Sequence, residues 1–211
     1  MKPPLFIAGG AFGASVIDRI SESCPSDRAH IVADRESLRD LIEGRPFVGV
    51  ALWRSHEAIC YEIDEYCFRQ QVPWFLSLLD GPALCSMLFV PGRGACYACF
   101  RRRFLTHQPN PEVQLALERA YTQDASSGPE GYPPPAVSIA VDVLWKAFGS
   151  AAYQGSTFSR LHLLTLDASS SEIISVHGCS RCGSANPEVC GSSRFTARAV
   201  AALAMILKID V

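Results

Sequence analysis

The hydrophobic pattern divides the first half of the chain into alternating strands and helices. Consecutive apolar residues, typical of parallel strands buried on both faces, occur at 5–8, about 29–33, 47–52 and 74–79. Apolar residues at helical spacing follow the first three runs, from the glycine turn at 9–13 through Ile20, at 35–42 and at about 57–71, where Pro73 ends the helix. Such alternation with short connections predicts an α/β fold, with a Rossmann-like, mostly parallel sheet and flanking helices.

The second half has a less regular pattern. An apolar run at 87–90 leads into the turn residues Pro91 and Gly92. Residues 106–135 are rich in proline, serine and glycine around a short helical segment near 112–121, which indicates a mobile crossover or lid. The pattern then predicts a helix over 136–148, a two-stranded antiparallel unit at 161–166 and 172–176, and a final helix over 194–207.

Four cysteines carry the strongest chemical signal. They form two CxxC pairs among turn-forming residues, Cys96 with Cys99 and Cys179 with Cys182. Four thiolates at this spacing predict a tetrahedral, structural zinc site that ties the centre of the chain to its C-terminal part. Cys190 is a possible competing ligand, and His177 is expected to be a neighbour of the second pair.

Composition and charge narrow the class of protein. The 211 residues are 48% apolar and only 19% charged, which favours a partner-covered surface, as in a homodimer or a larger complex. The formal net charge of −2 gives no support to nucleic-acid binding, and we expect the run 101–103, three arginines, to be a solvated face. Without a signal peptide or an apolar run of about 20 residues, we expect a cytoplasmic protein with no membrane segment, so Cys24, Cys60, Cys67 and Cys85 should be free, buried thiols.

A glycine turn between the first strand and the first helix is a candidate nucleotide site. Gly9, Gly10 and Gly13 lie where helix N-terminal amides could hold a phosphate, and Asp34 after the second strand could bind a ribose. A purely structural turn, and for Asp34 an ordinary helix N-terminus, explain the same residues, because Ala8 stands where a dinucleotide fingerprint prefers glycine.

The order of these motifs resembles the ThiF/MoeB superfamily, whose members adenylate the C-termini of ubiquitin-like proteins. The glycine turn is followed by Val72-Pro73-Trp74, by Gly81-Pro82, by 89–99 with the first CxxC pair, and by the closing HGCSRCG at 177–183. The resemblance spans about residues 4–207. It implies a single ThiF-like domain over 1–211, with a Rossmann-like half at 1–90, the first zinc knuckle and flexible crossover at 91–135, and C-terminal helices, hairpin and second knuckle at 136–211.

Within the superfamily, the stretch from Gly81 to Arg102 is most similar to the ThiF-like partner proteins of azole-modified peptide biosynthesis. These proteins work with a YcaO enzyme, a cyclodehydratase that uses ATP to convert Cys, Ser or Thr of a precursor peptide into azolines. They usually carry an N-terminal peptide-recognition element. Because the first strand begins at Leu5, we expect this chain to lack that element and to meet the peptide through a separate recognition protein.

Adenylating members of the superfamily carry an aspartate after the strand that corresponds to 47–52, where it holds magnesium. This chain has Trp53-Arg54-Ser55-His56 there, and an indole cannot ligate magnesium. The resemblance therefore implies an accessory, non-catalytic subunit that does not bind ATP. Two alternatives remain: an ATP-dependent adenylyltransferase acting on a peptide or sulfur-carrier C-terminus, and a nicotinamide-dependent oxidoreductase using the same glycine turn.

Overall fold

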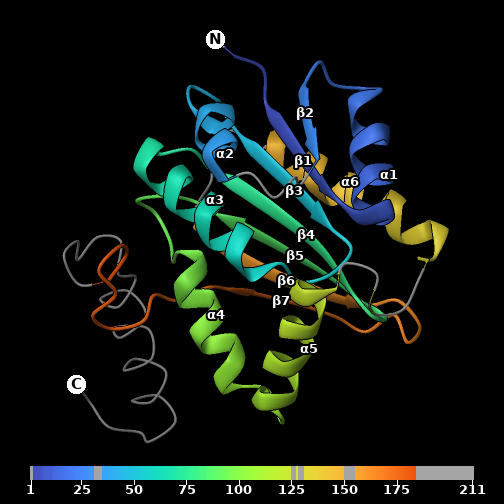
Figure 1. Cartoon of the computed structure of the whole chain (residues 1–211), viewed down its shortest axis with the longest axis vertical. Helices are drawn as coiled ribbons and strands as arrows, with labels where there is room; N and C mark the ends of the chain where they lie inside the picture. The colour runs from blue at the N-terminus through green and yellow to red at the C-terminus, as the bar shows by residue number, and fades with distance from the viewer. Residues whose placement is uncertain (1, 31–34, 125–126, 128–130, 150–154, 184–211) are drawn as a thin grey trace, which may run out of the picture.

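The fold is built on one mixed sheet of seven strands, as the computed structural model shows (Figure 1). The structure describes residues 2–30, 35–124, 127, 131–149 and 155–183. The strands are β1 (Leu5–Gly9), β2 (Asp27–His30), β3 (Val48–Leu52), β4 (Trp74–Asp80), β5 (Ala83–Phe89), β6 (Thr157–His162) and β7 (Ala168–Glu172). The helices are α1 (Gly10–Ser21), α2 (Arg35–Ile42), α3 (Glu57–Gln70), α4 (Tyr97–Thr106), α5 (Pro111–Gln123) and α6 (Pro134–Gly149).

The strand order is β2-β1-β3-β4-β5-β6-β7. The strands β1 to β4 pair in parallel, whereas β5, β6 and β7 are added by antiparallel pairing. Two successive reversals give β6 the direction of β4, so only β5 and β7 run against the others. The expected Rossmann-like, mostly parallel sheet with flanking helices is confirmed.

Helices cover both faces of the sheet, as the continuous apolar runs of the central strands require. On one face, α1 and α6 pack against a core that contains Phe6, Phe12 and Phe47. On the other face, α2, α3 and the start of α4 pack against a core around Trp74 and Ile63. The layers are visible in Figure 1. Every residue of β3 and β5 is buried as a result.

The antiparallel end of the sheet differs from the sequence-based prediction. The pattern gave strands at 161–166 and 172–176, and both assignments are wrong by about four residues, because the strands lie at 157–162 and 168–172. The apolar run that drove the assignment lies largely in the turn, where Leu164 and Leu166 are 80% and 71% exposed. β6 gains its place by pairing with the buried β5, so its own hydrophobicity is a poor guide to its limits.

Other expectations have mixed outcomes. The helical segment near 112–121 is α5, and the predicted helices at 35–42, 57–71 and 136–148 agree with α2, α3 and α6 within two residues. β5 begins at Ala83, four residues earlier than the apolar run at 87–90 indicated. The end of the predicted second strand, Asp34, Cys190 and the helix over 194–207 lie outside the described residues. Among the described helices, none is long and apolar enough to cross a membrane.

Candidate functional site

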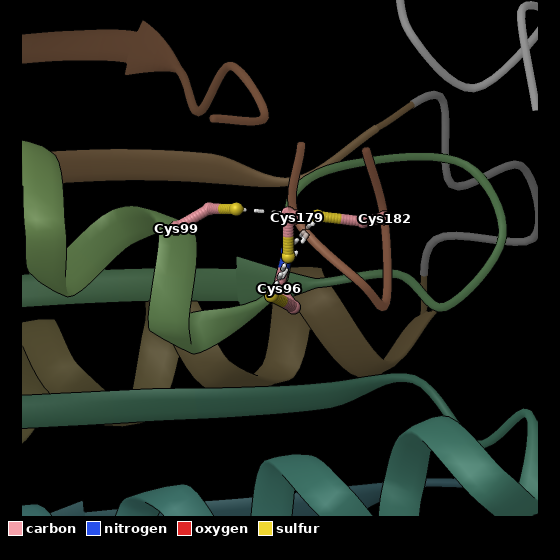
Figure 2. Close-up of side chains that lie close together, drawn as sticks. All are labelled: Cys96, Cys99, Cys179 and Cys182. Carbon is pink, nitrogen blue, oxygen red and sulfur yellow. Dashed lines mark hydrogen bonds between the residues drawn. The ribbon is translucent and has the colours of Figure 1, made fainter. Parts of the chain in front are cut away.

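The four knuckle cysteines meet at one point beside the sheet (Figure 2). Their sulfur atoms all lie within 4.8 Å of one another. Sulfur atoms of the two knuckles are 3.3 Å apart for Cys99 and Cys182, 3.6 Å for Cys96 and Cys182, and 3.7 Å for Cys96 and Cys179. A zinc ion with Zn–S bonds of about 2.3 Å in tetrahedral geometry would place its sulfurs about 3.8 Å apart. The cluster could therefore hold a metal ion of that size.

Local backbone geometry positions the first knuckle. Cys96 precedes α4 as its N-cap residue, and Cys99 lies in the first turn of that helix, so both sulfurs project from one helix end. Backbone N–H groups also orient the sulfurs: Cys96 donates to Sγ of Cys182 at 3.3 Å, and Val176 donates to Sγ of Cys99 at 3.2 Å. Such second contacts fix ligand direction before a metal binds.

The second knuckle is a tight turn that only glycine allows at its end. The Gly183 N–H donates to the Cys179 carbonyl at 2.9 Å, and a Cβ at Gly183 would lie 2.4 Å from the Cys179 nitrogen. Gly178, just before the turn, has φ of +76°, a left-handed conformation that favours glycine. The glycines around the CSRC sequence are thus required by the turn.

Charged side chains anchor this knuckle to the body of the protein. Arg181 donates to the buried carboxylate of Asp64 on α3 at 2.7 Å, and Trp74 donates to the other oxygen of Asp64 at 3.2 Å. Arg103 of α4 donates to the carbonyls of Ile174 and Ser175, at 2.7 and 3.0 Å. The segment after β7 is therefore held to α3 and α4 by contacts besides the thiols.

Burial and mutual hydrogen bonding shift the pKa values of the cysteine thiols. Cys96, Cys99 and Cys182 are buried and Cys179 is half-buried. Hydrogen bonding with the thiols of Cys96 and Cys99 lowers the pKa of Cys182. His177 is exposed, and the group of ligating atoms in the described part of the chain consists of the four cysteines alone. The other four described cysteines are buried, as predicted, and burial raises the pKa of Cys85 to about 12.

The glycine turn has clear structural functions. A Cβ at Gly13 would lie 2.2 Å from the Ala51 carbonyl oxygen, so this glycine permits the close packing of α1 on β3. Gly10 has φ of +72°, and a Cβ there would lie 2.9 Å from Cβ of Trp53. The backbone N–H of Trp53 also donates to the Gly9 carbonyl at 3.0 Å. The indole therefore lies directly against the turn that the sequence offered as a phosphate cradle.

A small cavity lies next to Trp53 at the carboxyl ends of the strands. It has a volume of about 120 Å³ and is lined by Trp53, Arg54, Leu79, Asp80, Gly81, Tyr121, Gly131 and Pro133. The Arg54 guanidinium stacks on the Trp53 ring at 3.9 Å and on the Tyr121 ring at 4.9 Å, and it donates to the Ser127 carbonyl. Pockets for drug-sized ligands run from about 300 Å³ upward. The cavity is smaller than that range.

The arginine run does not form the solvated face that the sequence indicated. Arg101 is only 4% exposed and forms ion pairs with Glu57 of α3, at 3.0 Å, and with Glu118 of α5. Tyr97 donates to Glu57 at 2.7 Å, and Gln114 donates to Glu118 at 3.0 Å. The prediction is wrong for Arg101 because the run lies on a helix, where one position in the turn faces the interior while Arg102 remains exposed.

This buried network was missed at the level of sequence. One weak signal was available: 97 and 101, like 114 and 118, are spaced four residues apart and so share a helix face. Nothing in the sequence indicated that α4 and α5 face each other. Burial raises the pKa of Glu57 and of Asp80, a carboxylate at the end of β4 that lines the neighbouring cavity.

Several solved structures have a similar fold. The heterocyclase TruD matches with a TM-score of 0.54 and 18% identity over 86% of this chain. A chain of the E. coli microcin synthetase McbBCD complex matches with a TM-score of 0.60 and 11% identity over 84% of this chain. E. coli MccB with ATP matches with a TM-score of 0.58 and 14% identity over 86% of this chain. This is a ThiF-like fold. The expected resemblance is confirmed at the level of fold.

This chain is shorter than these proteins. It spans 28% of the TruD chain, 67% of the McbBCD chain and 66% of the MccB chain. No protein-family model and no curated protein matches the sequence. The similarity therefore supports the fold, and the function has to be inferred from the residues of this chain.

Proposed function

We propose that this chain is an accessory, non-catalytic subunit of a YcaO-dependent cyclodehydratase complex that forms azoline heterocycles in a ribosomally made precursor peptide. Its contribution would be docking and activation of the YcaO enzyme. The fold similarity to TruD and to a chain of the McbBCD complex supports the context. The observation that carries the non-catalytic role is Trp53, whose indole packs on Gly10.

The chemistry of phosphate binding explains why this contact matters. A glycine turn binds phosphate when the backbone approaches the anion closely and helix N-terminal amides face it. Here the indole lies against one side of the turn, and Arg54 stacks over the same ring. The small cavity beside Trp53, about 120 Å³ against about 300 Å³ or more for pockets of drug-sized ligands, supports this part of the proposal. Gly9, Gly10 and Gly13 therefore act in folding rather than as cofactor-binding residues.

A structural zinc ion bound by Cys96, Cys99, Cys179 and Cys182 is the second part of the proposal. The four sulfurs supply a complete soft-ligand set, which leaves no open coordination position for catalysis. The ion would hold α4 and the segment after β7 together and so maintain the docking surface. Because thiolates are needed, a reducing, cytoplasmic location fits this site.

An ATP-dependent adenylyltransferase is the competing function. The similarity to MccB with ATP and the retained strand, glycine turn and helix favour it. A substitution at Ala11, which is exposed next to the glycine turn at the start of α1, can distinguish the adenylyltransferase from the accessory subunit. In Ala11→Glu an acidic side chain would repel a bound triphosphate, yet it suits a helix N-terminus. Ala11→Gln is the uncharged control.

Reconstitution tests the proposal. A YcaO enzyme and a precursor peptide encoded near this chain are combined with ATP, with and without the chain, and dehydration of the peptide is followed by mass spectrometry. We expect the chain to accelerate dehydration and Ala11→Glu to do so equally well. Dehydration that is independent of the chain, or that Ala11→Glu abolishes while Ala11→Gln does not, would contradict the accessory role.

A further inference from the structure

The turn that joins β6 to β7 presents two leucines to solvent. Leu164 and Leu166 are more exposed than any other large apolar side chain in the described part of the chain. Figure 1 shows this turn projecting past the end of the sheet, beside the turn between β4 and β5. The Leu163 N–H donates to the Pro82 carbonyl at 2.7 Å, and the Leu163 side chain packs against the core under α1 and α6. The exposed pair is therefore carried on an anchored base.

Hydrogen bonds fix the conformation of this turn. The Leu166 N–H donates to the His162 carbonyl at 2.8 Å, and the His162 N–H donates to the Asp167 carbonyl at 2.9 Å. Side chains add to these backbone bonds: the Thr165 hydroxyl donates to the Asp167 carboxylate at 2.6 Å, and the Thr165 N–H donates to Nδ1 of His162 at 3.2 Å. A surface that is ordered in advance loses little conformational entropy when it binds a partner.

The backbone of Leu166 has a conformation that leucine does not favour. Its φ is +61°, in the left-handed region that glycine or asparagine usually occupies at the end of such a turn. Contacts within the described part of the chain offset little of this cost, because the side chain is largely exposed. Strained backbone in a well-ordered segment points to a function. A partner that buries the side chain would offset both the strain and the exposure.

We propose that the leucine tip, defined as Leu164 and Leu166, inserts into an apolar groove of the YcaO enzyme; this inference rests on the proposed accessory function. Two projecting leucines fit a concave surface of a folded protein, which an extended precursor peptide does not offer. Burial of such apolar anchors in a pocket is the usual source of binding energy at protein interfaces.

Charges near the tip favour this partner over two others. The stretch 161–180 contains Asp167 and Glu172 but no lysine or arginine. An anionic membrane surface attracts basic segments, so it is a poor match for this stretch. Contact between the tips of two copies would bring the two Asp167 carboxylates together, and like charges repel. A groove with basic side chains at its rim is the complementary surface.

Titration calorimetry of the full chain with the YcaO enzyme tests the proposal. We expect Leu164→Ser to raise Kd roughly tenfold or more, because burial of a leucine side chain contributes at least that factor. Leu117→Ser is the matched control, since Leu117 is an exposed leucine of α5, away from the turn. It should leave Kd unchanged.

Leu166→Gly separates binding from folding. Glycine adopts a φ of +61° without strain, so Tm should stay the same or rise. The loss of the apolar side chain should nevertheless weaken binding by a similar factor to Leu164→Ser. A leucine that only holds the turn together would instead lower Tm when it is replaced, and weakened binding that accompanies a fall in Tm in both variants would overturn the proposal.

The remaining outcomes separate the leucine tip from the accessory function. Unchanged binding by Leu164→Ser and Leu166→Gly, with dehydration still accelerated by the unmodified chain, would overturn the leucine tip alone. Failure of the unmodified chain to bind the YcaO enzyme would overturn both. Sedimentation of the chain alone and with anionic lipid vesicles tests the other occupants: a dimer or vesicle complex that Leu164→Ser dissociates would assign the tip to a second copy or a lipid surface and overturn the proposal.

Discussion

Replacing Glu118 with glutamine removes one charge from the most deeply buried ion pair in the described part of the chain. The Glu118 and Arg101 side chains are 7% and 5% exposed, so water can replace little of their interaction. Breaking a buried pair costs about 3–5 kcal/mol when the remaining charge is left alone. Here Arg101 keeps Glu57 at 3.0 Å. We therefore expect a smaller cost of about 2 kcal/mol, the range of a hydrogen bond to a charged group.

The loss should be visible globally and locally. For a chain of this size, 2 kcal/mol corresponds to a fall in Tm of about 4–8 °C. Glu118 is the only buried residue of α5, so that helix should also exchange its amide hydrogens faster. Thermal unfolding followed by circular dichroism and hydrogen exchange measure the two effects.

Glu112→Gln is the matched control, because Glu112 lies on the same helix but is exposed. It should change the free energy of unfolding by no more than about 0.5 kcal/mol. If Glu118→Gln and Glu112→Gln gave equal stabilities and unchanged exchange in α5, the reasoning that one buried ion pair fastens α5 would be refuted.

Three further outcomes follow from the same structure. Cys182→Ser, or treatment with a chelator, should abolish stoichiometric zinc binding and lower Tm sharply, because binding of structural zinc is coupled to folding. Elemental analysis that finds no zinc in the folded, unmodified chain would contradict the zinc site. Gly13→Ala should lower the free energy of unfolding in urea by about 3 kcal/mol, because the added Cβ would clash with the Ala51 carbonyl. Gly149→Ala is the control: Gly149 has open space around it, so this change should be neutral or stabilising by up to about 1 kcal/mol. Burial raises the pKa of Asp80, so above the ordinary aspartate value of about 3.9 the folded protein holds a proton that the unfolded chain has released. This contribution to stability is lost as pH rises through the raised pKa. Asp80→Asn should therefore gain stability relative to the unmodified chain as pH rises above about 4, and parallel stability curves for the two proteins would argue against this.

Local patterns were sufficient to predict the parallel half of the fold. The runs that form β1, β3 and β4 are apolar because helices cover both faces, and each begins or ends at a glycine or proline signal. The antiparallel half was harder because β7 has no buried residue and β6 has only partly buried or exposed ones. β6 is placed by pairing with β5, and β7 by pairing with β6. The pairing of β6 with β5 is a long-range interaction that no local pattern encodes.

The candidate site shows the same division. The CxxC spacing was sufficient to predict that Cys96, Cys99, Cys179 and Cys182 lie together, because binding one metal ion imposes a recognisable spacing on its ligands. Trp53 was recognised as a departure from the family pattern, but its contact with Gly10 required coordinates. The partnership of Arg101 with Glu118 was not predictable, because it depends on how α5 folds back onto α4.

The central claim is that the glycine turn has lost nucleotide chemistry and that the chain acts by docking. Pyrophosphate exchange into ATP, measured with the intact chain, precursor peptides and magnesium, tests it most directly. The account predicts exchange no greater than that of a reaction without protein. Robust exchange that Ala11→Glu abolishes and Ala11→Gln preserves would contradict it and establish an adenylyltransferase.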